Sequence, residues 1–154
     1  MKVRKFRKED TSKVCYFVRR NMKEILPDFY PKDVVEFLYK HETPKKFLKR
    51  GKNRIYIVVT KKKRILGIAG LEENDVKSFF VNPSYHKKGI GNLLISEIEK
   101  IAKLRKLKTL TVHSSFNAEG FYAKCGFKKI RKFANKVGPI ILEGIFMEKK
   151  LNYE

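Results

Sequence analysis

Two glycines and two lysines stand together in residues 81–94, VNPSYHKKGIGNLL, where an apolar stretch is followed by a helical pattern. Gly89 and Gly91 allow the backbone to adopt positive φ angles and to approach a ligand closely. A helix that begins at such a turn presents unpaired N–H groups and the positive end of its dipole at one point. Lys87 and Lys88 add positive charge, although two lysines in a turn are also typical of a solvated surface. The segment therefore predicts a phosphate-binding turn.

The spacing of the glycines excludes two common nucleotide sites. A Walker loop requires GxxxxGK followed by serine or threonine, and this pattern does not occur in the chain. The dinucleotide fingerprint requires a third glycine three residues after Gly91, and Leu94 occupies that position. The phosphate ligand must therefore be recognised by a different pattern.

The turn lies between a predicted strand and a predicted helix. Apolar residues recur at intervals of three and four from Ile90 to Ala102, which predicts an amphipathic helix of about four turns. The other elements alternate between the two periodicities. We expect strands at 2–6, 54–60, 64–71, 76–81, 109–113, 128–133 and 139–151, and helices at 8–26, at 30–41 with 43–50 as its continuation, and at 117–126. Asp10 or Thr11 is the expected cap of the first helix.

This order predicts a mixed α/β fold with several hairpins and one crossover helix. A chain of 154 residues suits one domain, which we expect to span 1–154. Cys15 and Cys125 stand far apart, without a CxxC pair or a histidine cluster, which indicates neither a disulfide framework nor a zinc site. We find no signal-peptide pattern and no apolar run long enough to span a membrane, so we expect a cytoplasmic protein.

A second motif, NAEGFYAKCGF at 117–127, places asparagine and alanine before a Phe-Tyr pair and a terminal Gly-Phe. Together with HKKGIG at 86–91, it resembles the GNAT superfamily of acetyl-CoA-dependent N-acetyltransferases. The first motif of that family is Gln or Arg, two variable residues, Gly, a variable residue, and Gly or Ala. His86 departs from it at the first position. The segment 117–127 also resembles the branch that acetylates protein amino termini, ribosomal proteins included.

The resemblance implies a mostly antiparallel sheet of about seven strands, flanked by about four helices and splayed between strands 76–81 and 109–113. Acetyl-CoA, the donor cosubstrate, would lie at this splay, with its pantetheine amides paired to the main chain like an added strand. Phe79, Phe80 and Val81 would supply the main-chain groups, one of which would donate to the thioester carbonyl. The same three residues are also compatible with an ordinary buried strand.

The resemblance also implies contacts for the rest of the cofactor. The diphosphate would be wrapped by His86, Lys87, Lys88, Gly89, Ile90, Gly91 and Asn92. Asn117 would hydrogen-bond the pantetheine arm, although asparagine is also a frequent helix N-cap. Tyr122 and Lys124 complete the expected cofactor contacts.

Tyr122 is the expected catalytic acid, since a phenol can protonate the thiolate that leaves when an amine attacks a thioester. The alternative is a core aromatic residue, as we expect for Phe121. In the histone-modifying branch of the family, a glutamate six positions before the valine or isoleucine that ends the strand serves as the base. Counting back from Val81 gives Asp75, which is shorter and would act through a water; Glu73 is a rival, and both are also compatible with a polar turn.

The charge of the chain bears on its partners. With 37 basic and 16 acidic side chains, the net charge is +21, distributed without a single basic arm. Such a field attracts anions and disfavours polycationic acceptors, unless the acidic turn 72–75 forms a local groove. We expect a protein N terminus or a ribosome-associated protein as the acetyl acceptor, with a small amine metabolite as the alternative.

The basic charge of the chain has two further interpretations. The chain could be a basic module that contacts RNA or the ribosome and keeps the fold without the chemistry, or its charge could simply solvate the surface. Homodimers are common in the family, but no segment of the sequence specifies an interface.

Overall fold

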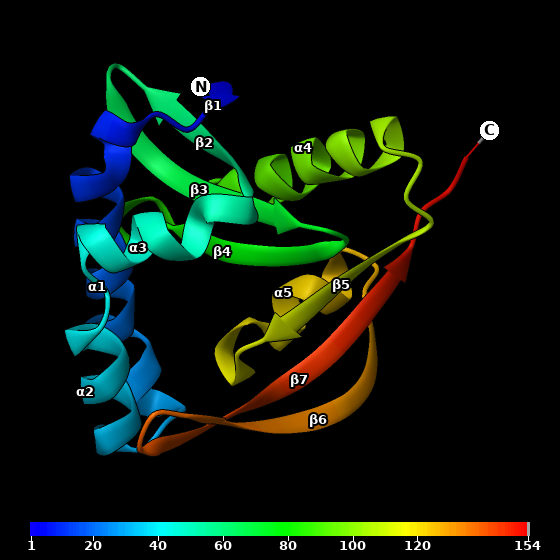
Figure 1. Ribbon diagram of the computed structural model, residues 1–154. Helices are drawn as coiled ribbons and strands as arrows, with labels where there is room; N and C mark the ends of the chain where they lie inside the picture. Colours follow the sequence, from blue (N-terminus) through cyan, green and yellow to red (C-terminus); the bar gives the residue numbers. More distant parts are fainter. Residues whose placement is uncertain (154) are drawn as a thin grey trace.

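The computed structural model describes residues 1–153, which form seven strands in one sheet and five α-helices (Figure 1). The strands are β1 Lys2–Lys5, β2 Ile55–Lys61, β3 Arg64–Glu72, β4 Asp75–Val81, β5 Thr109–Ser114, β6 Lys128–Val137 and β7 Ile140–Lys150. The helices are α1 Thr11–Glu24, α2 Lys32–Lys40, α3 Pro44–Arg50, α4 Ile90–Leu104 and α5 Glu119–Lys124. In this part of the chain, no helix is both long and apolar enough to cross a membrane.

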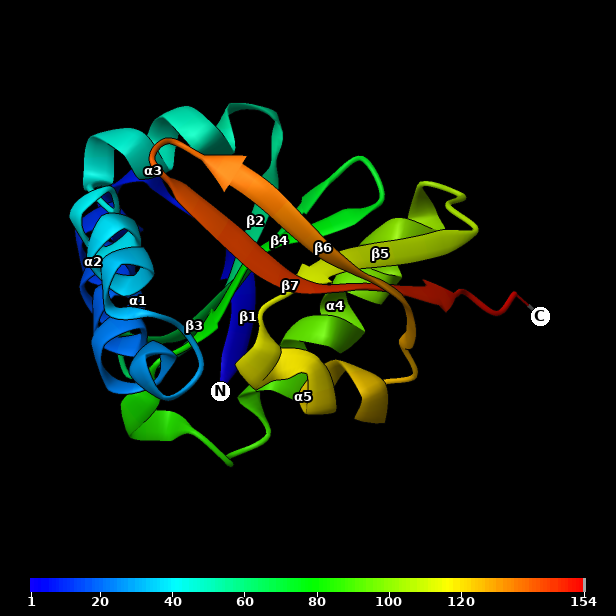
Figure 2. The same cartoon turned by 90° about the horizontal axis from the view of Figure 1, so that it is seen from below.

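The sheet is divided between β4 and β5. Its order is β1-β2-β3-β4-β5-β7-β6, and all neighbours are antiparallel except β4 and β5. These two parallel strands pair only at Asp75 with Thr111 and Val76 with Val112. Beyond these pairs they diverge, as Figures 1 and 2 show from two directions. The predicted mixed fold and its splay are therefore confirmed.

A β-bulge in β4 lies where the two strands part. The register of β3 with β4 shifts between Ile68, opposite Phe80, and Gly70, opposite Lys77. Ser78 occupies the bulge in a left-handed conformation, with φ +49°. The Nη1 of Arg54 donates to its Oγ at 2.9 Å. Because a bulge bends the strand that carries it, this local irregularity turns β4 away from β5.

The two faces of the sheet are covered by different helices. On one face, α4 packs against β2 and β3 through the buried residues Ile90, Leu94 and Ile98. On the other face, α1 and α3 contribute Phe17 and Phe47 to a second apolar cluster (Figure 1). Burial of each such side chain contributes about 1.5–3 kcal/mol, so both layers hold β4 firmly in place.

Tyr30 connects the helical layer to the far half of the sheet. Its hydroxyl donates to the carbonyl of Glu143 in β7 at 2.7 Å and accepts from the amide of Phe116 at 3.0 Å. Its ring stacks on Phe116 with 5.4 Å between centroids. The segment that leads into α5 is thereby fixed against both β7 and α2.

The structure differs from two local expectations. The segment TPKKFLKR does not continue the preceding helix but forms the separate α3, because the Thr43 hydroxyl accepts from the amide of Lys46 and starts a new helix. Asp10 does occupy the N-cap position of α1, but its side chain accepts no capping hydrogen bond from that helix. Its carboxylate instead accepts two hydrogen bonds from the Arg4 guanidinium, at 2.8 and 2.9 Å, and one from the amide of Arg7.

The Asp10 contacts predict a pH-dependent stability. The hydrogen bonds from Arg4 hold the pKa of Asp10 below its ordinary value, so this stabilisation is present above pH 4 and is lost as the pH falls through the lower, folded-state pKa. At pH 7, Asp10→Asn should lower the free energy of unfolding by about 1.5–3 kcal/mol. Urea unfolding between pH 7 and pH 3 should show the difference from wild type shrinking with acid. The exposed neighbour Glu9 serves as control, and Glu9→Gln should not change the free energy of unfolding. If Asp10→Asn were less stable than wild type by the same amount at every pH, the assignment would be contradicted.

Candidate active site

The turn between β4 and α4 has the left-handed backbone predicted for Gly89, whereas Gly91 lies within α4 and has no positive φ. Lys87 and Gly89 adopt left-handed conformations with φ +61° and +80°, and α4 begins at Ile90. A Cβ on Gly89 would meet no atom within 4 Å, so this side of the turn is open. The first amides of α4 have no partner within the helix, and Leu93 is the first residue whose amide bonds back to Gly89. These are the features that a diphosphate requires, and its binding here stays a prediction.

Gly91 has a packing role that the sequence did not reveal. A Cβ at this position would lie 2.8 Å from Cε1 of Phe121 in α5, which is too close for any real side chain. Phe121 in turn packs against Phe79 of β4, with 5.4 Å between ring centroids. The missing side chain therefore allows α5 to approach the start of α4 and the bulged strand.

His86 fastens the turn to the end of β4. Its Nε2 lies 3.0 Å from the carbonyl oxygen of Val81. The same oxygen accepts from Nδ2 of Asn21 in α1 at 2.9 Å. Both acceptor positions of this carbonyl are thus occupied, and a cofactor amide that bonded to it would have to displace one of these side chains. Lys87, Lys88 and Asn92 are exposed around the turn.

The main-chain groups of β4 divide between its two neighbours. The amide of Asn82 donates to Leu66 of β3 at 2.8 Å, and Phe80 is paired with Ile68 in the same ladder. Since successive residues of a strand direct their main-chain groups to opposite sides, Phe79 and Val81 face the gap toward β5. Phe79 and the amide of Val81 are therefore able to receive an extra strand, whereas Phe80 has its main chain in the ladder and its side chain against the α1 cluster.

Asn117 carries a buried oxygen without a partner. In residues 1–153, its Oδ1 is enclosed and accepts no hydrogen bond. The residue that precedes α5 is Ala118, and that helix has no side-chain cap, so the capping alternative is not realised. An unsatisfied buried polar atom costs about 1–3 kcal/mol, which an amide donor on a pantetheine arm would recover. This orphaned atom fits the expected cofactor. Lys124 lies exposed at the end of α5.

Tyr122 lies in an aromatic environment beside the gap. The residue is 4% exposed, and its ring contacts Phe79, Phe121 and Phe127 at centroid distances of 5.6, 5.4 and 5.5 Å. Burial raises the pKa of its phenol far above the ordinary value, and the charges of Cys125 and Asp75 raise it further. The phenol therefore keeps its proton at neutral pH and can donate it. No hydrogen bond between residues 1–153 uses its hydroxyl.

Asp75 lies at the closed end of the gap, where β4 and β5 still pair. Its carboxylate accepts from the Thr111 hydroxyl at 2.7 Å, forms an ion pair with Lys77 at 3.0 Å and lies 3.2 Å from Nδ1 of His113. Glu73, the rival base, is exposed in the β3–β4 turn with φ +56°.

His113 is a candidate that the sequence patterns did not single out. The one signal for it was the alternation of strand KTLTVHS, which places His113 and Thr111 on the face opposite the buried Leu110 and Val112.

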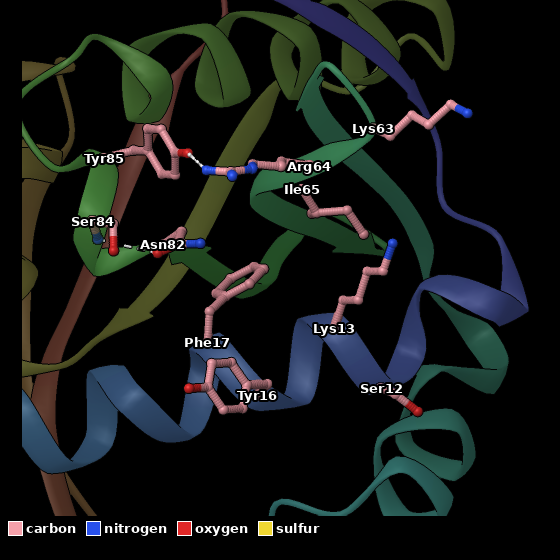
Figure 3. Close-up of a pocket in the computed structure, with 10 residues that line it drawn as sticks. All are labelled: Ser12, Lys13, Tyr16, Phe17, Lys63, Arg64, Ile65, Asn82, Ser84 and Tyr85. Carbon is pink, nitrogen blue, oxygen red and sulfur yellow. Dashed lines mark hydrogen bonds between the residues drawn. The ribbon is translucent and has the colours of Figure 1, made fainter.

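A separate hollow of about 520 Å³ lies on the α1 side of the sheet (Figure 3). It is lined by α1, the β2–β3 turn and the residues after β4, including Lys13, Lys63 and Arg64. Arg64 donates to the hydroxyl of Tyr85 at 3.2 Å across it (Figure 3). None of its lining residues belongs to the gap between β4 and β5, so the candidate active site depends on the divided strands and not on this hollow.

Comparisons with known proteins agree with this architecture. Residues 25–145 match the acetyltransferase (GNAT) domain family. No curated protein sequence matches the chain. Among solved structures, a GCN5-related N-acetyltransferase from Rhodopseudomonas palustris superposes with a TM-score of 0.91 at 24% identity, covering 97% of this chain and 95% of that one. The PaiA N-acetyltransferase from Thermoplasma acidophilum, in complex with coenzyme A, gives 0.77 at 22% identity over 97% and 98%.

A third similar structure is the ribosomal-protein-S18-alanine N-acetyltransferase from Escherichia coli, with a TM-score of 0.71 at 15% identity over 99% of this chain and 95% of that one. At such identities the structural likeness shows the fold. The family match covers most of the chain, so the chain belongs to the GNAT acetyltransferase family. It is an acetyl-CoA-dependent acyltransferase.

The packing of Gly91 against Phe121 can be tested with a matched pair of glycines. Gly91→Ala should lower the free energy of unfolding by about 1–3 kcal/mol, since the added methyl group overpacks the contact between α4 and α5. Gly120→Ala, in α5, places a methyl group where no atom lies within 4 Å and should stabilise the helix by about 0.5–1 kcal/mol. Urea denaturation of both variants measures the difference. Equal stabilities would show that the packing role of Gly91 is wrong.

Proposed function

We propose that this chain transfers the acetyl group of acetyl-CoA directly to the α-amine of a protein N terminus, for which a ribosome-associated protein is a candidate. The family establishes acetyl transfer, and the acceptor is the proposal. Acetyl-CoA supplies an activated acyl group as a thioester. The residues described above then have to hold it, orient its carbonyl and exchange protons with the acceptor and the leaving group.

The site offers a donor or acceptor for each part of the cofactor. The open face of Gly89, with the free amides at the start of α4, would hold the diphosphate, helped by Lys87 and Lys88. The amide of Val81 would donate to the pantetheine arm, since its carbonyl is already bonded to Asn21 and His86, and Asn117 would use its orphaned oxygen. The amide of Phe79, which faces the gap beside the bulge, would donate to the thioester carbonyl.

Tyr122 would protonate the leaving sulfur. The phenol is protonated throughout the physiological range, because its ordinary pKa is about 10 and burial raises the pKa further. The phenol also has no partner in the described chain that would compete for that proton. A buried phenol beside the divided strands therefore suits direct transfer, in which the amine attacks the thioester without an acyl-enzyme.

The single observation that carries the choice of acceptor is the pairing of two of the three carboxylates in the acidic turn. Glu72 forms an ion pair with Arg54 at 3.0 Å, and Asp75 forms one with Lys77 at the same distance, which leaves Glu73 as the exposed carboxylate of the turn. One such carboxylate is a weak attraction for polyamines or lysine-rich tails, and the net charge of +21 repels them. An α-amine, with a pKa of about 7.7–8.0 against about 10.4 for lysine, is also more often unprotonated at neutral pH. The fold shared with an acetyltransferase that modifies a ribosomal-protein N terminus supports the same choice.

Replacement of Tyr122 tests its role as the acid. Tyr122→Phe should lower kcat by about 10²-fold or more, because the thiolate then leaves without a proton donor. Affinity for coenzyme A, measured by calorimetry, should change little. Tyr16→Phe, at an exposed position of α1, is the control and should leave both values unchanged. Full turnover by Tyr122→Phe would remove this residue from the mechanism.

A panel of amines tests the acceptor, with thiol release from acetyl-CoA as the readout. We expect a peptide with a free N-terminal alanine to be acetylated at least about tenfold faster than the same peptide with a blocked N terminus and one internal lysine, because fewer of its amines are protonated. Spermidine and simple aliphatic amines should be poorer still.

Two results would contradict the proposed acceptor. A preference for spermidine or for a small amine would replace it with a metabolite. Salt-sensitive RNA binding together with no thiol release from any amine would indicate a binding module.

A further inference from the structure

We infer that His113 is the general base of acetyl transfer and that Asp75 positions it; this rests on the proposed direct attack by an amine. His113 extends from β5 next to the point where β5 parts from β4. Its Nδ1 lies 3.2 Å from Oδ2 of Asp75. A carboxylate beside an imidazole, next to a gap that receives a thioester, is the arrangement from which a histidine can take a proton.

The contact with Asp75 determines which ring nitrogen is free. An ionised carboxylate can only accept hydrogen bonds, so Nδ1 of His113 must carry the proton of the neutral ring. Nε2 then has an unshared electron pair and points away from Asp75. Asp75 itself is engaged by Thr111, Lys77 and His113 at once, which leaves it a poor base and a good orienting group.

The ring of His113 is also fixed by its neighbours in β6 and β7. Its centroid lies 5.1 Å from that of Phe133 and 4.8 Å from that of Phe146, which is opposite His113 in the β5–β7 ladder. Despite these contacts, the side chain is 36% exposed, so a substrate amine can reach it. A held but accessible imidazole is what proton transfer requires.

The two other histidines lack these features. His41 stacks on Phe37 with 4.1 Å between centroids, and its Nδ1 bonds to the carbonyl of the same residue. His86 bonds to the carbonyl of Val81. In the described chain, His113 is therefore the histidine that contacts a carboxylate.

Four charged groups face His113 from the strands around it. Asp75 and Lys77 come from β4, Arg131 of β6 lies over the ring of Phe146, and Glu148 of β7 is opposite Thr111 on the same face. Two of these groups are carboxylates and two are cations, so charges of both signs surround the ring.

The base and the acid then lie on opposite faces of the sheet. His113 shares a face with Thr111, whereas Tyr122 packs into the α4 cluster with Leu110 and Val112. As the nitrogen of a neutral amine bonds to the acetyl carbon, His113 Nε2 takes one N–H proton. The carbon–sulfur bond breaks with its electron pair on sulfur, which receives the proton of Tyr122. His113 then releases its proton to water and Tyr122 regains one, so protons and charge balance.

The pH dependence of kcat/KM tests this inference. In wild type, kcat/KM should fall on the acid side as the imidazole protonates. His113→Gln should lose about 10²-fold or more of kcat/KM, with the KM for acetyl-CoA within about twofold. An amine acceptor adds an acid limb through its own protonation, so the loss of the limb in His113→Gln is read from the profile with water as the only acceptor. Asp75→Asn should move the limb to lower pH, because the charge that stabilises the imidazolium is gone. His41→Gln is the matched control and should keep both rate and limb.

The assay does not depend on the identity of the acceptor. The profiles are measured with whichever amine releases most thiol, and again with water as the only acceptor. Failure of the N-terminal peptide would therefore refute the proposed acceptor and leave this test intact. Nitrogen-15 NMR of the imidazole should show Nε2 without a proton in wild type. Three results would overturn the assignment. The first is a proton on Nε2 in the NMR spectrum, and the second is a His113→Gln enzyme with the wild-type rate and the wild-type acid limb of kcat/KM. The third is an acid limb that is lost in Asp75→Asn but kept in His113→Gln.

Discussion

The structure depends on one incomplete strand pairing. β4 and β5 share two residue pairs and then separate, because the bulge at Ser78 bends β4, while β4 stays paired with β3 on both sides of the bulge. Main-chain groups of Phe79 and the amide of Val81 are left facing a gap inside an otherwise continuous sheet. In most proteins such groups would be paired, so their persistence needs strong support from the surrounding layers.

That support comes from both faces and from the turn. α4 and α1 pack on opposite sides of β3 and β4, while Asn21 and His86 satisfy the carbonyl at the end of β4. Tyr30 fixes the segment that carries Asn117 against β7. These contacts keep the gap from closing and maintain a buried, unsatisfied oxygen on Asn117. The protein thus retains polar groups whose partners a ligand would supply.

Charge is organised differently near the site than over the whole molecule. The chain as a whole is strongly basic, yet the carboxylates of Glu72 and Asp75 are matched one for one with Arg54 and Lys77. The electrostatic field around the divided strands therefore depends on these two ion pairs and on His113 more than on the net charge of the molecule. Aromatic rings on the other side of the gap keep Tyr122 neutral. One sheet can in this way present a base to one face and an acid to the other.

Much of this protein was predictable from local patterns. Periodicity located the strands and α4, and the glycines of the turn with the Phe-Tyr segment were enough to indicate the family. Local signals could not assign the contacts made between distant segments. Thr43 starts a separate helix, Asp10 binds Arg4, Gly91 accommodates Phe121, and Phe80 belongs to the β3 ladder. His113 acquires a carboxylate partner only because β4 and β5, 38 residues apart at this pair, meet in parallel. Composition and spacing determine which elements form, whereas side-chain pairing depends on register and packing, which exist only once the sheet is assembled.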